Sequence, residues 1–213
     1  MTMGRTDPTR SLSTVYHVGD LSGEREQPYV SYEGDGVSVS QHPDVWRSLI
    51  QKTGDSSLPE TATTYELISD GATFFEAVPG GPPRESIIEW AVANGFVHYE
   101  PGFEVRWQGT DSYHMMQFFD RPRAEREAAV ADRELSEIML LALSERGRQY
   151  WEHAFEQLPS EADPLVICDL TPMWYAEARG FDGVWWDEDL APTRYSAPRG
   201  VIFQSRLDEW TIS

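Results

Sequence analysis

The end of the chain constrains its fold most strongly, because two short apolar runs lie there between turn signals. Gly180-Phe-Asp-Gly183 is a turn that leads into Val184-Trp-Trp186, and Gly200-Val-Ile-Phe203 follows after the acidic loop Asp187-Glu-Asp189. Short apolar runs bounded by turn residues predict buried β-strands. Two such strands joined by a short loop usually pair. We therefore expect a sheet here with the acidic loop at its rim, where functional sites are commonly built on a rigid scaffold.

The charge balance excludes some partners. The 213 residues include 36 acidic and 17 basic side chains, which give a formal net charge of −19. Binding to a phosphate backbone depends on lysine and arginine contacts, so non-specific nucleic-acid binding is not expected. An acidic surface that keeps the protein in solution explains the charge, and so does a nucleic-acid mimic or an inhibitor of a basic partner. The acidic residues are scattered rather than gathered in dense rows, which favours the first explanation.

The sequence gives no signal for a membrane or for metal binding. No run of about eighteen apolar residues is present, and Met1–Ser13 has no apolar segment of the kind that directs secretion. We expect a soluble, cytoplasmic protein. The single cysteine, Cys168, lies in the apolar run Pro164–Cys168 and is interpreted as a small buried hydrophobe. The five histidines are widely separated in the sequence, so no metal site is predicted.

The first part of the chain is expected to form a tail and then strands. Residues 1–12 lack periodicity and predict a flexible tail. Thr14–Val18 has strand character, and Val37–Ser40 alternates so that its serines share one face and its valines the other. We expect 13–213 to form one α+β domain, with 63–160 as a possible inserted lobe of helices and hairpins.

Hairpins are the strongest expectation for that middle region. Thr63–Ile68 and Ala72–Val78 are separated by Ser69-Asp-Gly71, a turn signal, so we predict two paired strands. Phe103–Trp107 and Tyr113–Phe119 predict a second hairpin.

Helices are expected at four places. Pro43 begins an amphipathic segment, and Ile87–Val92 has helical spacing and is followed by Asn94-Gly95 as a stop signal. From about 123 to 157 the composition turns to Ala, Glu, Arg and Leu, which predicts the longest helical region. After a buried strand at 165–168, residues 172–178 predict a short helix. Strands at both ends with helices between them indicate the α+β class.

Familiar catalytic motifs are absent from the sequence, including phosphate-binding glycine loops, the nucleophile elbow and the paired zinc histidines. The best single candidate is His17, which lies in the first predicted strand just before Gly19. Its imidazole could point into a cleft and bind ligand hydroxyls, or it could be satisfied by a backbone carbonyl. The hydroxyls of Ser38 and Ser40 lie on one strand face and could join it.

Three segments carry a family resemblance. Tyr16-His-Val-Gly19 resembles the first-strand Tyr-His-Gly motif of the ADP-ribosyltransferase fold. Gly36–Ser40 with Pro43–Arg47 resembles the second motif of that family, a strand ending in Ser or Thr that leads into a helix. Gly180–Val184 with Arg199–Phe203 resembles the last motif, a Gly-Tyr-Asp-Gly turn followed by an apolar strand. The segments occur in the family's order.

The resemblance implies a split β-sheet and an NAD-using transferase, with NAD as a substrate. By position in the motifs, the resemblance implies that His17 binds the ribose of NAD. It implies that Tyr16, Gly19, Ser38 and Ser40 make the contacts around that ribose. In most members the last strand opens with a catalytic glutamate, but this chain has Arg199 there. A cation at that position would repel the cationic sugar that a carboxylate stabilises.

Three explanations of Arg199 stay open. Glu188 in the acidic loop could supply the carboxylate from a shifted position. Alternatively, Arg199 and Arg194 could bind a phosphate, as in the RNA 2′-phosphotransferase branch of the fold. The chain could also be an inactive relative that only binds.

The sequence therefore predicts an NAD-dependent ADP-ribosyltransferase, with His17 and Glu188 as catalytic residues and an unknown acceptor that could be a protein. In this scheme His17 and Arg199 face each other across a groove that holds the dinucleotide. The alternative is a non-catalytic acidic binding protein, such as an inhibitor, an immunity partner or a phage anti-defence factor, that acts through its negative surface.

Overall fold

The structure is a computed structural model that describes residues 7–19, 21, 36–52, 62–78, 84–109, 112–130, 132–154, 164–186 and 198–213. The strands are β1 (Thr9–Val18), β2 (Val37–Ser40), β3 (Thr64–Val78), β4 (Val97–Gln108), β5 (Tyr113–Phe118), β6 (Arg133–Leu143), β7 (Gly183–Trp186), β8 (Arg199–Ile202) and β9 (Thr211–Ile212). The helices are α1 (Pro43–Lys52), α2 (Arg84–Ala93), α3 (Arg121–Ala128), α4 (Glu145–Ala154), α5 (Pro164–Ala178) and the 3-10 helix η2 (Gln204–Glu209). This is the mixed α+β class that the sequence predicts. None of the helices in the described ranges is long and apolar enough to cross a bilayer.

The chain divides into two compact units. The first contains the described residues up to Ile87 and those from Pro172 onward, and the second contains the described residues from Ile88 to Thr171. These boundaries differ from the expected lobe at 63–160, because β3 belongs to the first unit. Helices α2 and α5 each contribute residues to both units.

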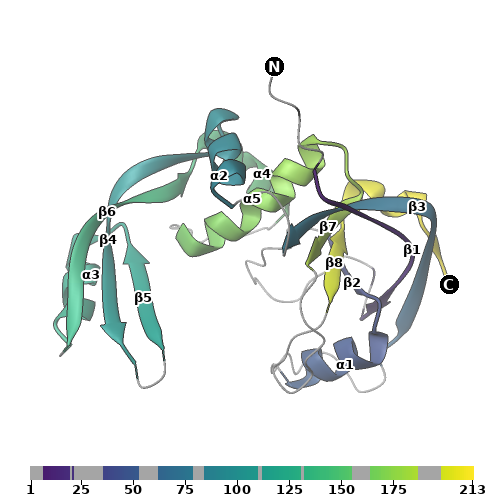
Figure 1. Cartoon of the computed structure of the whole chain (residues 1–213), viewed down its shortest axis with the longest axis horizontal. Coiled ribbons are helices and arrows are strands. Elements are labelled where there is room, and N and C mark those ends of the chain that lie inside the picture. The colour runs from purple at the N-terminus through teal and green to yellow at the C-terminus, as the bar shows by residue number, and fades with distance from the viewer. Residues whose placement is uncertain are drawn as a thin grey trace. The chain divides into compact units, whose positions relative to one another are not determined.

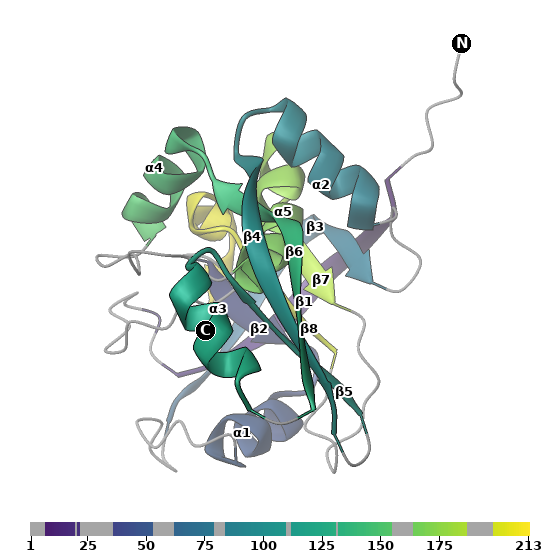
Figure 2. The same cartoon turned by 90° about the vertical axis from the view of Figure 1, so that its left-hand side faces the viewer.

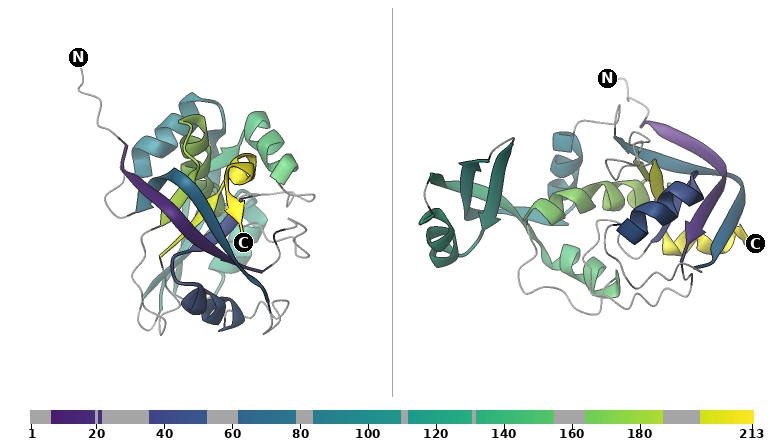
Figure 3. Two further views of the ribbon diagram at one scale, coloured as in Figure 1. Left: turned by 90° about the vertical axis from the view of Figure 1, so that its right-hand side faces the viewer. Right: turned by 90° about the horizontal axis from the view of Figure 1, so that it is seen from below.

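Five strands of the first unit form a closed ring (Figures 1 and 3). The order is β1-β2-β8-β7-β3, and β3 pairs back with β1. All contacts are antiparallel except β3 with β7, which is parallel. The short strand β9 adds to β3 outside the ring. The predicted pairing of the two C-terminal strands is confirmed as β7 with β8.

The inner face of the ring holds the main hydrophobic core. Its buried residues come from every strand of the ring and from the segment after η2: Leu12, Val15, Val37, Val39, Leu67, Ala72, Phe74, Trp185, Ile202 and Trp210. The alternation predicted for β2 is confirmed, since its two valines enter this core. An irregularity between Leu12 and Thr14 shifts the register of β1 against β3 by two residues, because Leu12 lies opposite Ala72 and Thr14 opposite Ile68. Because of this irregularity, Leu12 and Val15 point to the same face.

The strands of the ring are strongly tilted. Directly opposed residues can be followed around the ring from Glu66 of β3 to Tyr16, Ser40, Arg199 and Trp186. The path returns to β3 at Val78, twelve residues beyond its start. A large stagger of this kind requires strands that cross the ring axis at a steep angle.

The outer face of the ring is covered in part by two helices. Trp46 of α1 lies against Arg199 of β8, and Tyr175 of α5 packs on Phe75 of β3 with ring centroids 5.3 Å apart. Asp7, just before β1, accepts a hydrogen bond of 2.8 Å from the Tyr175 hydroxyl. Both strand faces are therefore buried over much of the ring.

The second unit contains an antiparallel sheet in the order β5-β4-β6 (Figure 1), and Figure 2 turns this sheet and α3 toward the viewer. Helix α3 covers one face of this sheet, where Ala124 packs against Val105 and Phe118. The β4–β5 hairpin is the one predicted from the sequence. Gly95, with φ of 73°, ends α2 as expected.

Four local expectations are wrong. β1 begins at Thr9, so part of the expected tail is a strand that pairs with β3. β3 runs from 64 to 78 without a hairpin, because Ser69 donates to the carbonyl of Leu12 and holds Ser69-Asp-Gly71 in the sheet. Residues 133–143, expected to be helical, form β6. The segment 165–168, expected to be a strand, is the first part of α5.

Candidate functional site

The three resemblance segments meet on adjacent strands, β1, β2 and β8. Tyr16 lies opposite Ser40, Ser40 opposite Arg199, and Arg199 opposite Trp186. On the other side of β1, Tyr16 lies opposite Glu66. Directly opposed residues in an antiparallel pair project to the same face. These five residues therefore form one cross-strand row on the outer face of the ring, which we call the Tyr16 row.

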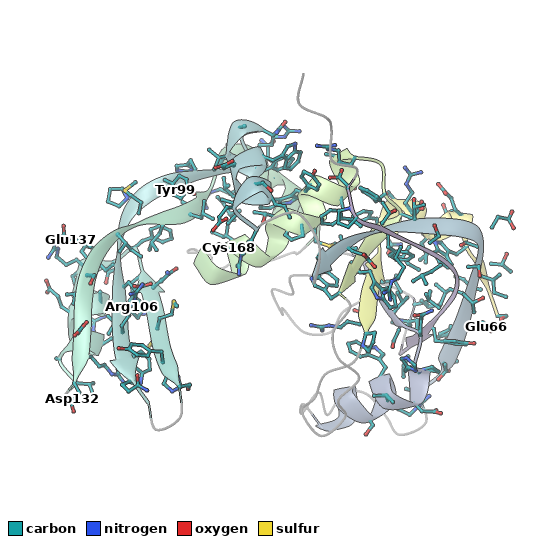
Figure 4. The ribbon with its side chains drawn as sticks, in the orientation of Figure 1. Glu66, Tyr99, Arg106, Asp132, Glu137 and Cys168 are labelled. Atoms are coloured by element: carbon teal, nitrogen blue, oxygen red, sulfur yellow. The ribbon has the colours of Figure 1, made fainter. Side chains whose placement is uncertain are left out.

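One end of the Tyr16 row is a hydrogen-bonded pair. The Tyr16 hydroxyl donates to Glu66 Oε1 over 3.0 Å. That hydrogen bond, and then the negative charge of Glu66, raise the pKa of Tyr16 above its ordinary value of 10.0. The phenol therefore stays protonated at neutral pH and fixes the carboxylate. Figure 4 labels Glu66 beside β3.

Ser40 joins β2, β8 and α1 in the middle of the row. Its Oγ donates to the carbonyl of Pro198 over 2.9 Å and accepts from the amide of His42 over 3.0 Å. The side chain is completely buried. Ser40 thus fixes the start of α1 to the strand that carries Arg199, and Ser38 lies two residues away on the same face.

Arg199 lies in a desolvated position. Its guanidinium carbon is 5.7 Å from the centroid of the Trp46 ring on α1. Burial lowers the pKa of Arg199 to about 10. The guanidinium remains charged at neutral pH, and because water solvates it poorly, an anion that reached it would be bound more strongly than at the surface.

A second arginine of α1 reaches the beginning of β3. Arg47 Nη2 donates to the Thr64 hydroxyl and to the carbonyl of Ala62, each over 2.7 Å. Thr64 lies two residues before Glu66 on β3, so both side chains are on one strand face. α1 therefore contacts the outer face of the ring at both β8 and β3.

His17 does not face Arg199, and the expected groove between these two residues is wrong. His17 follows Tyr16 on β1 and lies opposite Tyr65 of β3. The His17 and Tyr65 rings stack with their centroids 6.4 Å apart, and Tyr65 packs against the core. Alternation along a strand places His17 and Tyr16 on opposite faces. Arg199 is on the Tyr16 face, so the sheet itself separates the two side chains.

The imidazole of His17 instead holds the junction of β1 and β2. Its Nδ1 is 2.8 Å from the backbone carbonyl of Ser38. A carbonyl can only accept, so Nδ1 carries the proton of this hydrogen bond. This is the second of the two interpretations that the sequence allows, a histidine bonded to a backbone carbonyl.

The remaining predicted site residues lie within the β1–β3 pairing or outside the described residues. Gly19 adopts φ of 138°, and its amide donates to the carbonyl of Thr63, which continues the pairing of β1 and β3. Glu188 and Arg194 lie outside the described residues. Both tryptophans of β7 are buried, Trp185 in the core and Trp186 on the opposite face.

Sequence reasoning missed Glu66 as a member of the Tyr16 row, and it missed Arg47 and Trp46 as residues of α1 that contact the same face of the ring. Glu66 was assigned to a hairpin strand and had no pattern that linked it to Tyr16. Trp46 and Arg47 stand inside the second resemblance segment, so their positions at the start of α1 were the available signal.

Comparisons with known proteins identify no relative. No family model matches the sequence, and no curated protein or solved structure gives a significant match. Within the described part of the chain no group of three or more potential ligands could hold a metal ion.

Proposed function

We propose that this chain is an NAD-dependent transferase that moves ADP-ribose to an acceptor, with its site on the Tyr16 row. The observation that carries the proposal is the adjacency of β1, β2 and β8. Segments that resemble the three family motifs, and that are remote in sequence, share one surface with a carboxylate. The sequence resemblance supports the chemistry, and the cross-strand register supports the grouping of residues.

In the proposed reaction the bond between nicotinamide N1 and ribose C1′ breaks, and its electron pair leaves with neutral nicotinamide. The sugar becomes a cation, an acceptor oxygen or nitrogen bonds to C1′, and the acceptor loses a proton. A carboxylate near C1′ stabilises this cation. Glu66 is the carboxylate of the Tyr16 row, and Tyr16 holds its Oε1. In this proposal Glu66 takes the role first considered for Glu188.

The arginines supply the complementary charge. Phosphates bind best to guanidinium groups, which donate two hydrogen bonds in a fixed plane. Arg199, in its poorly solvated position beside Trp46, would hold a phosphate of NAD. His17 acts as a positioning residue, because its hydrogen bond to Ser38 fixes β2 against β1.

The test is release of nicotinamide and transfer of labelled ADP-ribose from NAD in a lysate. Glu66→Gln should lower turnover by about a hundredfold or more, as expected for a group that stabilises charge in the transition state. Asp70→Asn, an exposed carboxylate on the same strand, is the matched control and should behave like the wild type. Equal turnover in the two variants, or no nicotinamide release by the wild type, contradicts the proposal.

A non-catalytic binding protein is the second candidate, and one observation favours it. Several predicted site groups are engaged within the fold, including His17 with Ser38, Ser40 with Pro198, and the Gly19 amide with Thr63. Under this alternative NAD is neither cleaved nor able to raise the melting temperature. A basic protein would instead bind at low salt and dissociate at high salt.

A further inference from the structure

The three-stranded sheet of the second unit has two edges that differ in chemistry. In the described part of the chain, β5 and β6 each pair only with β4, so each leaves one row of backbone groups without a strand partner. Such a row is a template for another strand, and proteins usually protect it with charges, prolines or bulges.

The β6 edge carries that protection. Arg133, Glu134 and Glu137 place three charges along the strand. Arg133 pairs with Glu127 of α3 over 2.9 Å, and Glu137 pairs with Arg121 of the same helix. A strand added at β6 would have to accommodate these charges and their partners.

The β5 edge has none of these protective features. Its sequence, Tyr113-His-Met-Met-Gln-Phe118, contains no acidic residue, no lysine or arginine and no proline, and its register with β4 is regular from end to end. Tyr113 is 75% exposed and Met115 is 49% exposed. Tyrosine and methionine are enriched in protein interfaces.

The exposed side chains of β5 lie on the face that α3 does not cover. Tyr113 and Met115 lie opposite Gln108 and Arg106 of β4, whereas Met116 and Phe118 alternate with them and pack toward α3. Arg106 is labelled in Figure 4. Among the described residues, an added strand would therefore meet a backbone edge without charges or prolines and the exposed side chains of Tyr113 and Met115.

We propose that the β5 edge binds an extended segment of a basic partner protein, which adds to the sheet as a fourth strand. Main-chain hydrogen bonds would give the affinity, and Tyr113 and Met115 would contact alternate side chains of the segment. The net charge of −19 selects this occupant, because it attracts a basic chain and repels a second copy of this one. This inference is independent of the NAD reaction, which concerns the first unit.

The experiment uses the full chain and a synthetic peptide of alternating valine and threonine with two lysines at each end. A second peptide carries glutamates in place of the lysines. Binding is followed by fluorescence anisotropy at low and high salt. Met115→Lys places a charge on the β5 edge, and Met139→Lys, at a methionine of β6 that is 55% exposed, is the matched control.

The lysine peptide should bind the wild type and the Met139→Lys variant alike, and bind the Met115→Lys variant at least about tenfold more weakly. Amide hydrogen exchange should slow in β5 and stay unchanged in β6. No binding of the lysine peptide, equal binding of both peptides, or equal loss in both variants would overturn the proposal. A wild-type dimer that Met115→Lys dissociates would also overturn it, since a second copy would then be the occupant.

Discussion

The two units use the same alternating strands in opposite ways. In the first unit five strands close into a ring, so the inner face becomes the core and the outer face lies partly under α1 and α5. In the second unit three strands stay open, with one face under α3 and two edges that no described strand pairs with. Closure fixes residues that are remote in sequence into one row, whereas the open sheet keeps backbone groups available for a partner.

The largest difference is expected for matched aromatic truncations. Phe74 is fully buried in the ring, with its centroid 5.8 Å from that of Trp185, and Phe74→Ala should cost the first unit about 3–5 kcal/mol. Phe103 is half-buried under Arg121, and Phe103→Ala should cost the second unit about 1–2 kcal/mol. Native-state hydrogen exchange measures each strand separately. Equal costs would argue against the closed ring.

Glycine substitutions give a smaller contrast. A Cβ on Gly200 would meet the Trp185 ring and the carbonyl of Val184, so Gly200→Ala should destabilise the ring by about 1–3 kcal/mol. A Cβ on Gly102 in β4 would meet the Cδ1 and Cγ atoms of Leu140 and approach the carbonyl of Phe118, but a leucine can change its rotamer more readily than the Trp185 ring can move. Gly102→Ala should therefore cost less, by the same exchange measurement. A larger cost at Gly102 would contradict the packing described for the ring.

The cap of α3 offers a third test, confined to the second unit. Asp120 Oδ1 accepts from the Arg123 amide over 2.8 Å at the start of the helix. Asp120→Ala should cost about 1 kcal/mol, whereas Asp120→Asn should keep most of the cap. Thermal unfolding of the two variants measures the difference. Similar melting temperatures for both would show that α3 does not depend on this hydrogen bond.

The smallest effect concerns pH and the Tyr16 row. Glu66 raises the pKa of Tyr16, so the folded protein holds the phenolic proton more tightly than the unfolded chain. The resulting stability is fully present below pH 10.0 and is lost as the pH rises through the higher folded pKa. Glu66→Gln should move the tyrosinate absorbance of Tyr16 to lower pH, with Tyr16→Phe identifying its signal. An unchanged titration of Tyr16 in the Glu66→Gln variant would show that Glu66 does not raise the pKa of Tyr16.

Short-range patterns in the sequence predicted several elements well. The period-two alternation of β2, the paired C-terminal strands and the β4–β5 hairpin follow from local rules, and each is present. The start of α1 at Pro43 and the end of α2 at Gly95 follow from proline and glycine chemistry.

The errors arose where tertiary structure overrides local preference. Leu135, Ile138, Met139 and Leu143 have helical spacing, yet β4 pairs with this segment along its full length and makes it a strand. Asp70-Gly71 is a good turn, but the Ser69 hydroxyl bonds to β1 and keeps the chain extended. α5 contains Pro172 and is helical on both sides of it.

The candidate site was predictable only in part. The three segments that carry the resemblance could be read from the sequence, and the resemblance implied that they belong to one site. The face of each side chain depends on the register, and the position of Glu66 on β3 depends on ring closure, neither of which the sequence displays. The prediction of a groove between His17 and Arg199 was wrong because the register places the two side chains on opposite faces of the sheet.

Disulfide cross-linking between paired cysteines tests most directly which face of the sheet each residue lies on. In a Cys168→Ser background, Tyr16→Cys with Ser40→Cys, and Ser40→Cys with Arg199→Cys, join residues that lie directly opposite each other. Opposed residues of adjacent strands are close enough for a disulfide. We predict that both pairs cross-link under mild oxidation and that His17→Cys with Arg199→Cys does not. A rapid cross-link between positions 17 and 199, with none between 16 and 40, would contradict the arrangement.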